Sequence, residues 1–563
     1  MPGSWRRAVP ALLLALTFAG LAAGAAALRS YDLGWHLRAG DWILEHGGAP
    51  PRRDVLSFTS ADAAWVDHEW LFQVLLAGSV RVLGPAGAWG LKQLLVLVAT
   101  LVPAGWLLWR GTSPLVVAML TCVALEGARF RFSERPEMAG LALLPIVLIL
   151  LAEWERGRAG PVVIGAVPIL VALWANLHPS ALLAAGLVGV WVVGSTLVPS
   201  APGAPRAGLR WTLLGLVAVA LLANPWGPAL LRVPFAIRDA LAGEGIANPE
   251  WGHSVRAEFW FFWVTLAALG GAAARAWRRG GRPRLPGALL LLGLAVAGGA
   301  ALRLIGFFFV ALPVLVPLAW RRGTPEPVSP PARAISLPGA TRLALLLPLL
   351  AGTGFLLRPA GAPLGAGLAP GRFPEAMARA WTELGVRGPM YNPVRFGGYL
   401  SWALAPERVF LDGRNEIHGP LLRRLAACRG GPDPRCQDRL LDEYGVEAAV
   451  VEYDDRPVTV GLPDGSRQER TTTSVWFRRS RWALIDWDDT ALLYVKRAGA
   501  NAELAARHED RWLMPEDPGV FEADWRAGRV AQTAARIELA KRRARRPDCR
   551  RLERLARIME PSQ

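Results

Sequence analysis

Apolar stretches of about twenty residues recur from the N-terminus to about residue 357, and no other feature constrains the fold of this chain as strongly. A helix of that length matches the hydrocarbon core of a bilayer. Of the 563 residues, 52% are hydrophobic and only 19% are charged, which is too apolar for one soluble domain of this length. We therefore predict a polytopic α-helical membrane protein.

The sequence changes in character after residue 357. Charged residues become frequent, apolar runs shorten to strand length, and no further candidate span follows. We therefore predict a transmembrane domain over residues 1–357, an α/β domain over 358–499 and a helical tail over 500–563. The transmembrane domain would contain about eleven helices, with a long first outer loop over residues 29–86.

The arginines predict how these helices are oriented. With a cytoplasmic N-terminus, most of them fall at inner turns, as do Arg156, Arg210 and Arg284. The C-terminal domain is then extracytoplasmic. The first span has a basic start and a small-residue end, so it is either a retained anchor or a cleaved signal peptide. The predicted spans cover residues 9–28, 87–109, 113–127, 139–154, 161–177, 181–199, 211–223, 258–276, 285–302, 305–320 and 339–357.

The net charge of +17 invites a nucleic-acid function, but membrane topology already explains arginines at the ends of apolar runs. A further basic stretch over 540–557 has a helical pattern, which is more typical of a solvated helix than of an anion-binding surface. The strong preference for Arg over Lys indicates a GC-rich bacterial genome. We therefore expect a protein of the bacterial inner (plasma) membrane. Its expected partner is the lipid bilayer, and we expect it to bind no nucleic acid.

Distinctive polar residues fall on the outer side of this topology. The first outer loop contains "DLGWHLRAGDWILEHG" (32–47) and "DHEW" (67–70), each at the start of a predicted amphipathic helix lying along the membrane. The second outer loop contains "RFRFSERPE" (129–137), and "LWANLH" (173–178) ends the fifth span. "NPEWGHS" (248–254) lies in the fourth outer loop. Ionisable groups at such depths are costly and usually functional.

This arrangement resembles the GT-C superfamily of membrane glycosyltransferases, which take sugars from polyprenyl-phosphate carriers. An acidic residue follows the first span, the first outer loop has two juxtamembrane helices, the next outer loop is rich in charges, and a soluble domain follows the last span. The quoted strings, together with "GGYL" and "DGR" in the C-terminal domain, look like a bacterial group of GT-C-like proteins. The resemblance implies inverting transfer of a hexosyl or pentosyl group to an extracytoplasmic glycan, lipid or protein acceptor.

Such a transfer needs a general base for the acceptor hydroxyl and cations around the departing phosphate. We predict Asp32 as the base, with Asp67 and Glu69 as alternatives, although each position also suits a helix cap. No P-loop or dinucleotide fingerprint is present, so we expect no nucleotide cofactor. His36 and His68 are either packing residues or, with the carboxylates, ligands of a divalent cation (Mg or Mn).

The other candidates for substrate binding are charged or polar residues near the outer ends of spans. Arginines there either bind phosphate or extend to lipid headgroups, and Asn176 and His178 either line a cavity or cap a helix. Arg303 lies between two apolar runs on the outer side, where the positive-inside bias would not place it. These candidates are Arg129, Arg131, Glu134, Arg135, Asn176, His178 and Arg303.

Two other functions remain open at this level. A transporter or flippase of lipid-linked glycans would also contain cavities and buried arginines, although paired halves with similar broken helices are not evident in the sequence. The chain is alternatively a catalytically silent GT-C-like scaffold for envelope assembly. An acidic base that is essential for glycan transfer would separate the enzyme from both.

The C-terminal domain alternates helix and strand patterns, which predicts a small α/β layered domain. Strands are predicted at 388–393, 408–414 and 447–453, and a hairpin over 481–497 turns at Asp488 and Asp489. The glycines of "FGGYL" (396–400) either hold a phosphate or allow close packing, and "DGR" (412–414) is either a ligand site or a structural pair. Cys428 and Cys436 are predicted to form a disulfide on the oxidising side.

Overall fold

The structure is a computed structural model that describes residues 3–160, 162–198, 203–237, 257–321, 338–359, 361–430, 433, 435–461 and 465–560. The chain forms two compact units. Unit 1 comprises Met1–Ser30, Gly40–Pro50 and Val66–Ala369, and unit 2 comprises Tyr31–Ala39, Pro51–Trp65 and Pro370–Gln563. Two pieces of the first outer loop, 31–39 and 51–65, therefore group with the C-terminal residues rather than with the helices that flank them in sequence.

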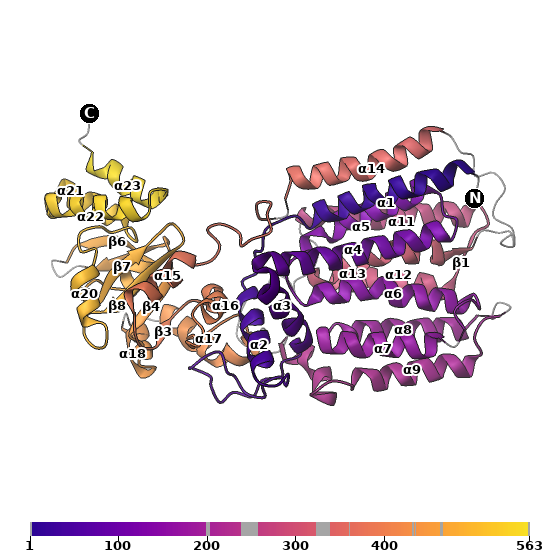
Figure 1. The fold of residues 1–563 in the computed structure, drawn as a ribbon, viewed down its shortest axis with the longest axis horizontal. Coiled ribbons are helices and arrows are strands. Elements are labelled where there is room, and N and C mark those ends of the chain that lie inside the picture. The colour runs from indigo at the N-terminus through magenta and orange to yellow at the C-terminus, as the bar shows by residue number, and fades with distance from the viewer. Residues whose placement is uncertain are drawn as a thin grey trace. The chain divides into compact units, whose positions relative to one another are not determined.

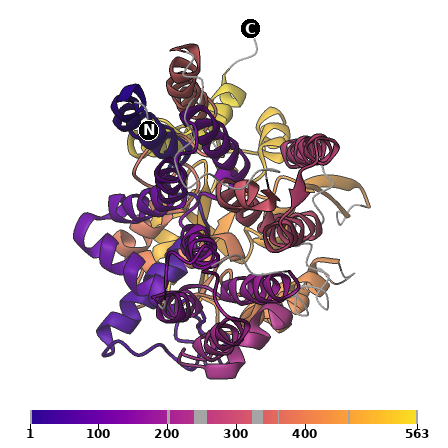
Figure 2. The same cartoon turned by 90° about the vertical axis from the view of Figure 1, so that its right-hand side faces the viewer.

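Unit 1 is a bundle of helices that run side by side, as Figure 1 shows from the side and Figure 2 along the helix axes. Each of the eleven predicted spans falls on a helix. These helices are α1 (Gly3–Ala23), α4 (Pro85–Trp109), α5 (Pro114–Ala128), α6 (Glu137–Glu155), α7 (Val162–Leu177), α8 (Ala181–Thr196), α9 (Ala207–Leu221), α11 (Trp260–Arg278), α12 (Leu285–Ala300), α13 (Ile305–Ala319) and α14 (Pro338–Leu357).

Four helices of the described part are long and apolar enough to cross a bilayer by length and composition. They cover Pro85–Trp109, Glu137–Glu155, Leu302–Ala319 and Gly339–Leu357, and several shorter apolar helices accompany them. The polytopic α-helical membrane fold is thus confirmed, while the number of crossings stays a prediction. The predicted fourth outer-loop motif at 248–254 lies outside the described residues.

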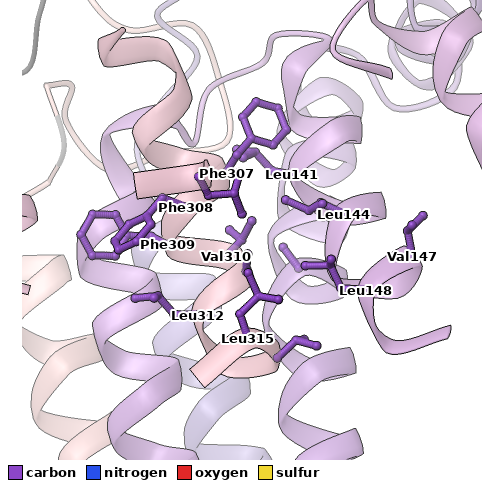
Figure 3. Packing of buried hydrophobic residues seen from close by; sticks show 14 of the residues in the cluster. Leu141, Leu144, Val147, Leu148, Phe307, Phe308, Phe309, Val310, Leu312 and Leu315 are labelled. Atoms are coloured by element: carbon purple, nitrogen blue, oxygen red, sulfur yellow. The ribbon is translucent and has the colours of Figure 1, made fainter. Parts of the chain in front are cut away.

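The core of unit 1 lies between α6 and α13, because both helices are apolar around most of their circumference. Leu141, Leu144 and Leu148 of α6 face the α13 side chains, as the sticks in Figure 3 show. Phe308 and Phe309 of α13 are 0% and 1% exposed. Close packing between these two helices fixes the position of α6. This matters for the candidate site because Glu137 lies in the first turn of α6.

The two predicted juxtamembrane helices are present as α2 (Leu33–Glu45) and α3 (Trp70–Leu83). In Figure 1, α3 runs crosswise to the bundle helices. It turns sharply into α4 at Gly84, whose φ of 61° favours glycine. Gly87 of α4 lets the two backbones touch, since a Cβ there would lie 2.0 Å from the Ser79 carbonyl oxygen.

Unit 2 contains a four-stranded sheet with the order β3-β4-β8-β7. The short strand β3 (Met390–Tyr391) runs parallel to β4 (Ala448–Glu452), and β4, β8 (Ala491–Lys496) and β7 (Trp482–Trp487) are antiparallel neighbours. The predicted hairpin at Asp488 and Asp489 is confirmed. A separate hairpin of β5 (Pro457–Gly461) and β6 (Arg467–Thr471) was not predicted.

Helices of unit 2 surround this sheet. The longer ones are α15 (Glu375–Leu384), α16 (Val394–Ala403), α17 (Asn415–Gly430), α18 (Cys436–Glu443), α21 (Pro518–Arg526), α22 (Gln532–Arg545) and α23 (Arg550–Met559). The predicted Cys428–Cys436 disulfide joins α17 to α18 and is confirmed. In the basic stretch, Arg542 is buried and binds Asp510 at 2.5 Å, which favours a structural role for that arginine.

The predicted strand over 408–414 is wrong. Within this segment, Val409 alone pairs with other backbone segments, through isolated bridges to Ser57 and to Met390. The reason lies in Asn392, whose side chain accepts a hydrogen bond from the Phe410 N–H (2.9 Å) and donates one to the Leu411 carbonyl (2.7 Å). The side chain therefore satisfies backbone groups that a strand would pair with a neighbour.

Candidate functional site in the membrane unit

The second outer-loop motif is tied to the chain that follows α1. The Glu134 carboxylate is 2% exposed and accepts hydrogen bonds from the backbone N–H groups of Arg29 and Ser30. Arg135 Nε donates to the Ser30 hydroxyl at 3.2 Å. The structure thus joins the second outer-loop motif to the start of the first outer loop, and the substrate-binding roles of Glu134 and Arg135 stay predictions.

Arg131 is held within the protein as well. Its guanidinium forms an ion pair with Glu137 at the start of α6, and both side chains are less than 10% exposed. Gly306 of α13 packs on the same arginine, since a Cβ there would lie 3.1 Å from its Cγ. Arg303 is half-buried in the short 3-10 segment Leu302–Leu304, directly before α13.

A pocket of 470 Å³ opens beside this motif. Its polar lining includes the three arginines Arg29, Arg129 and Arg358 and the carboxylates of Glu126 and Glu258, and its apolar lining includes Phe130, Phe259, Trp260 and Phe261. Arginine binds phosphate through a planar, always charged fork. Aromatic side chains beside it would cover an apolar chain. The pocket therefore suits an amphipathic ligand with an anionic end.

Contacts within the pocket hold its arginines in place. Arg129 donates to the Arg358 carbonyl at 2.7 Å, pairs with Glu126 at 3.0 Å and lies 5.4 Å from the Phe355 ring centroid. Arg29 Nη2 donates to the Phe130 carbonyl at 3.3 Å. These contacts hold both guanidinium groups at the pocket lining.

Sequence reasoning selected Arg129 but missed Arg29 and Arg358. Their positions in the sequence could have identified them. Each directly follows a predicted span at its outer end, where the positive-inside bias would not place a cation. That argument was applied only to Arg303. The two arginines share a pocket because α1 and α14 pack closely at Gly352, where a Cβ would lie 2.5 Å from the Phe18 ring. Past the helices, Ala27 N–H donates to the Pro363 carbonyl at 2.7 Å.

A second polar cluster joins "DHEW" to the end of α7. The Glu69 carboxylate lies 3.5 Å from His178 Nε2 and 3.8 Å from His68 Nε2. Trp70 Nε1 donates to Asn176 Oδ1 at 2.9 Å. Glu69 immediately precedes α3, but its side chain makes no capping hydrogen bond. The carboxylate therefore faces two histidines instead of serving the helix end.

Asp67 is a buried member of the same segment. It is 1% exposed, and its Oδ1 accepts a hydrogen bond from Gln73 Nε2 at 2.6 Å. His178 in turn is fixed by Ser180, whose hydroxyl lies 2.7 Å from its Nδ1. Gly140 in α6 allows this packing, since a Cβ there would lie 2.7 Å from the Ser180 hydroxyl. Both polar clusters thus adjoin the first turn of α6.

Asp32 and His36 belong to unit 2, whereas the other candidates belong to unit 1. The Asp32 carboxylate is half-buried and accepts a hydrogen bond from Trp35 Nε1 at 3.3 Å. It faces Gly413 of "DGR", where a Cβ would lie 2.4 Å from its Oδ1. Asp32 also precedes the first residue of α2, so its position suits a helix cap as well as a base. His36 is 2% exposed.

The "DGR" motif forms a buried ion network with the first outer loop. Arg414 Nη2 lies 2.6 Å from Asp412 and 2.9 Å from Asp54, and all three side chains are fully buried. Burial by itself raises the pKa of Asp412, but Arg414 and His418 outweigh it and hold that pKa well below its usual range. The motif is therefore a structural pair. The glycines of "FGGYL" serve packing, since a Cβ at Gly398 would lie 2.5 Å from the Tyr31 carbonyl oxygen.

The divalent-cation prediction stays a prediction. Within the described ranges, no group of three or more His, Cys, Asp or Glu side chains could hold a metal ion. The Glu69 carboxylate lies 3.5 Å from His178 Nε2 and 3.8 Å from His68 Nε2.

Comparison with known proteins yields likeness in fold only. No model of a known protein family matches the sequence, and no curated protein matches it. The crystal structure of ArnT from Cupriavidus metallidurans in the apo state has a TM-score of 0.51 at 13% identity, covering 87% of this chain and 98% of that one. The ArnT structure bound to undecaprenyl phosphate has a TM-score of 0.49 at 13% identity over 89% and 99%. The archaeal oligosaccharyltransferase AglB from Archaeoglobus fulgidus, with an inhibitory peptide and a dolichol-phosphate, has 0.49 at 9% over 84% and 75%.

The ArnT likeness extends over nearly the whole of both chains, so it concerns the helical bundle together with the C-terminal α/β region. At such low identity it establishes the architecture, and the chemistry has to be argued from the residues of this chain. The resemblance inferred from the sequence is thereby confirmed, and the chain has the fold of the GT-C superfamily of membrane glycosyltransferases.

Proposed function

We propose that this chain is a glycosyltransferase that moves a sugar from a polyprenyl-phosphate donor to an extracytoplasmic acceptor with inversion. The pocket of Arg29, Arg129 and Arg358 carries the proposal, because three arginines beside an aromatic wall match a phosphate attached to an isoprenoid chain. In this reading the arginines bind the phosphate while it leaves the sugar. The aromatic side chains contact the first isoprenoid units.

Asp32 is our proposed general base. It follows the first predicted span in the sequence, and its carboxylate is half-buried beside Gly413. In this proposal it receives the proton of the acceptor hydroxyl. The departing phosphate takes the electron pair of the broken glycosidic bond, and attack from the opposite face inverts the anomeric centre.

Glu69 is the alternative base. Its pairing with His178 gives a route for the proton onto an imidazole, and its side chain is 12% exposed. Asp67 is more deeply buried and bonds to Gln73, which favours a positioning role for it. Loss of one base should reduce the transfer rate by about 10²–10⁴-fold.

The test is transfer by purified, detergent-solubilised protein, supplied with polyprenyl-phosphate sugars and an envelope extract as acceptor. Asp32→Asn should reduce the transfer rate about 10²–10⁴-fold, whereas Asp62→Asn, an exposed change of the same kind in the same loop, should leave it unchanged. In detergent no membrane separates two compartments. Sugar transfer under these conditions is therefore catalysis and cannot result from transport. Equal activity of the Asp32→Asn and Asp62→Asn proteins would refute Asp32 as the base. If no donor is consumed by the unmodified protein, and no polyprenyl-linked sugar accumulates in a deletion strain, the enzyme proposal fails.

A further inference from the structure

A second pocket lies at the other end of α6. The candidate site adjoins the first turn of this helix, whereas this pocket includes its last residue, Glu155, and the arginines that follow. A helix of 19 residues is about 28 Å long, close to the thickness of a bilayer core. The pocket therefore faces the leaflet opposite to the candidate site, and it is independent of the proposed function.

The pocket has a volume of 460 Å³ and combines charge with apolar walls. Of its described lining residues, four are arginines (Arg156, Arg158, Arg282 and Arg284) and one is acidic. That acid, Glu155, already pairs with the buried Arg210 at 3.0 Å. Arg156 also pairs with Glu153 at 3.4 Å. The lining still contains more arginines than carboxylates and favours an anionic ligand.

Close helix packing holds these arginines at the mouth. A Cβ at Gly287 of α12 would lie 2.8 Å from the Leu318 carbonyl carbon of α13, and one at Gly194 of α8 would lie 3.1 Å from Pro286 Cα. The Arg284 N–H also donates to the Ala319 carbonyl at 2.8 Å. The backbone that carries Arg282 and Arg284 is therefore fixed against two helices.

The inner walls of the pocket are apolar and belong to membrane helices. They include Leu148 and Leu151 of α6, Leu290 of α12 and Trp191 of α8. A free phosphate would use the arginines but leave these walls without a partner. A phospholipid uses both, because its headgroup phosphate meets the arginines while its acyl chains lie along the leucines.

We propose that this pocket is a binding site for one anionic phospholipid. Basic pockets between membrane helices on the predicted cytoplasmic side are suited to such headgroups, since anionic lipids are concentrated in that leaflet. The contrast with neighbouring charges is informative. Arg278 and Arg279 lie at the end of α11, only a few residues before Arg282, yet neither lines the pocket.

The experiment counts lipids on the full chain by native mass spectrometry in detergent, with phosphatidylglycerol, phosphatidylcholine or inorganic phosphate added. One phosphatidylglycerol should bind more tightly than phosphatidylcholine. The double substitution Arg158→Gln and Arg284→Gln should weaken binding about 30-fold, or about fivefold for each arginine. The matched control, Arg278→Gln with Arg279→Gln, removes the same charge and should change binding less than about twofold.

Three outcomes would overturn the proposal. They are equal binding of phosphatidylcholine, equal weakening by the control pair, and displacement of the lipid by inorganic phosphate. A variant that keeps all four arginines, Leu318→Trp, fills the apolar wall instead. It should weaken lipid binding without creating phosphate binding, and it provides the test if the double arginine variant fails to fold.

Discussion

The buried Arg414 network offers the sharpest test of how the segment 51–65 is joined to the C-terminal part of unit 2. Replacing Arg414 with Leu would leave the carboxylates of Asp412 and Asp54 fully buried without their cation. Removing one partner of a buried ion pair costs about 3–5 kcal/mol. The guanidinium also lies 4.4 Å from the Trp65 ring centroid, so packing against that ring is lost as well. We expect the open population of unit 2 to rise by about 10²–10⁴-fold.

The free thiol of Cys549 reports on this opening. Its side chain is in the hydrophobic core of unit 2 and 5% exposed, and burial raises the pKa of the thiol to about 12, so it reacts slowly in the folded state. Cys428 and Cys436 are bonded to each other, and Cys122 is distinguished by peptide mapping. The assay is pulsed thiol labelling of the full chain in detergent across a urea series.

The pH dependence of the stability of unit 2 provides a second test of the same network. In the native protein, the pKa of Asp412 is depressed, so the stability that it contributes is present above the unfolded pKa of about 3.9 and is lost below it. Without Arg414, His418 remains beside Asp412, but burial is the largest single influence on this carboxyl, and we expect it to raise the pKa of Asp412 above its ordinary value. The Arg414→Leu protein should therefore become more stable from about pH 7 to about pH 5, while the native protein changes little there.

The control is Arg456→Leu, which removes an exposed arginine paired with Asp454 in the same unit and should cost less than about 1 kcal/mol. The reasoning is refuted if the two variants label Cys549 at similar rates. It is also refuted if the stability of the Arg414→Leu protein does not rise between about pH 7 and about pH 5.

Three further predictions follow from other contacts. Gly140→Leu should push Trp174 out of place and reduce thermal stability by about 1–3 kcal/mol, measured against Gly165→Leu, which has open space. Reducing the Cys428–Cys436 bridge should cost unit 2 about 2–3 kcal/mol from loop entropy, measured by urea unfolding with and without reductant. Arg358→Gln should raise the KM for a polyprenyl-phosphate donor about tenfold with a smaller change in kcat, because the guanidinium binds the phosphate before and during transfer. An unchanged KM would remove that arginine from the donor site.

Some features of this protein follow from the sequence alone. The apolar runs set the positions of the bundle helices, because the length and composition of a run are local properties that any neighbouring packing must accept. The hairpin at Asp488 and Asp489 likewise follows from two β-rich strands around a turn. The polar motifs of the outer loops were also visible, since ionisable residues beside spans stand out against an apolar background.

Tertiary structure decided which of these motifs meet. Arg29 and Arg358 share a pocket because α1 and α14 pack together at Gly352, and Glu69 lies beside His178 although 109 positions separate them in the numbering. Likewise, the segment 51–65 joins unit 2 through Asp54 and Arg414. Such contacts join residues far apart in the chain, and local periodicity contains no information about them. Helix positions could therefore be predicted, whereas the composition of the site depended on packing between distant helices.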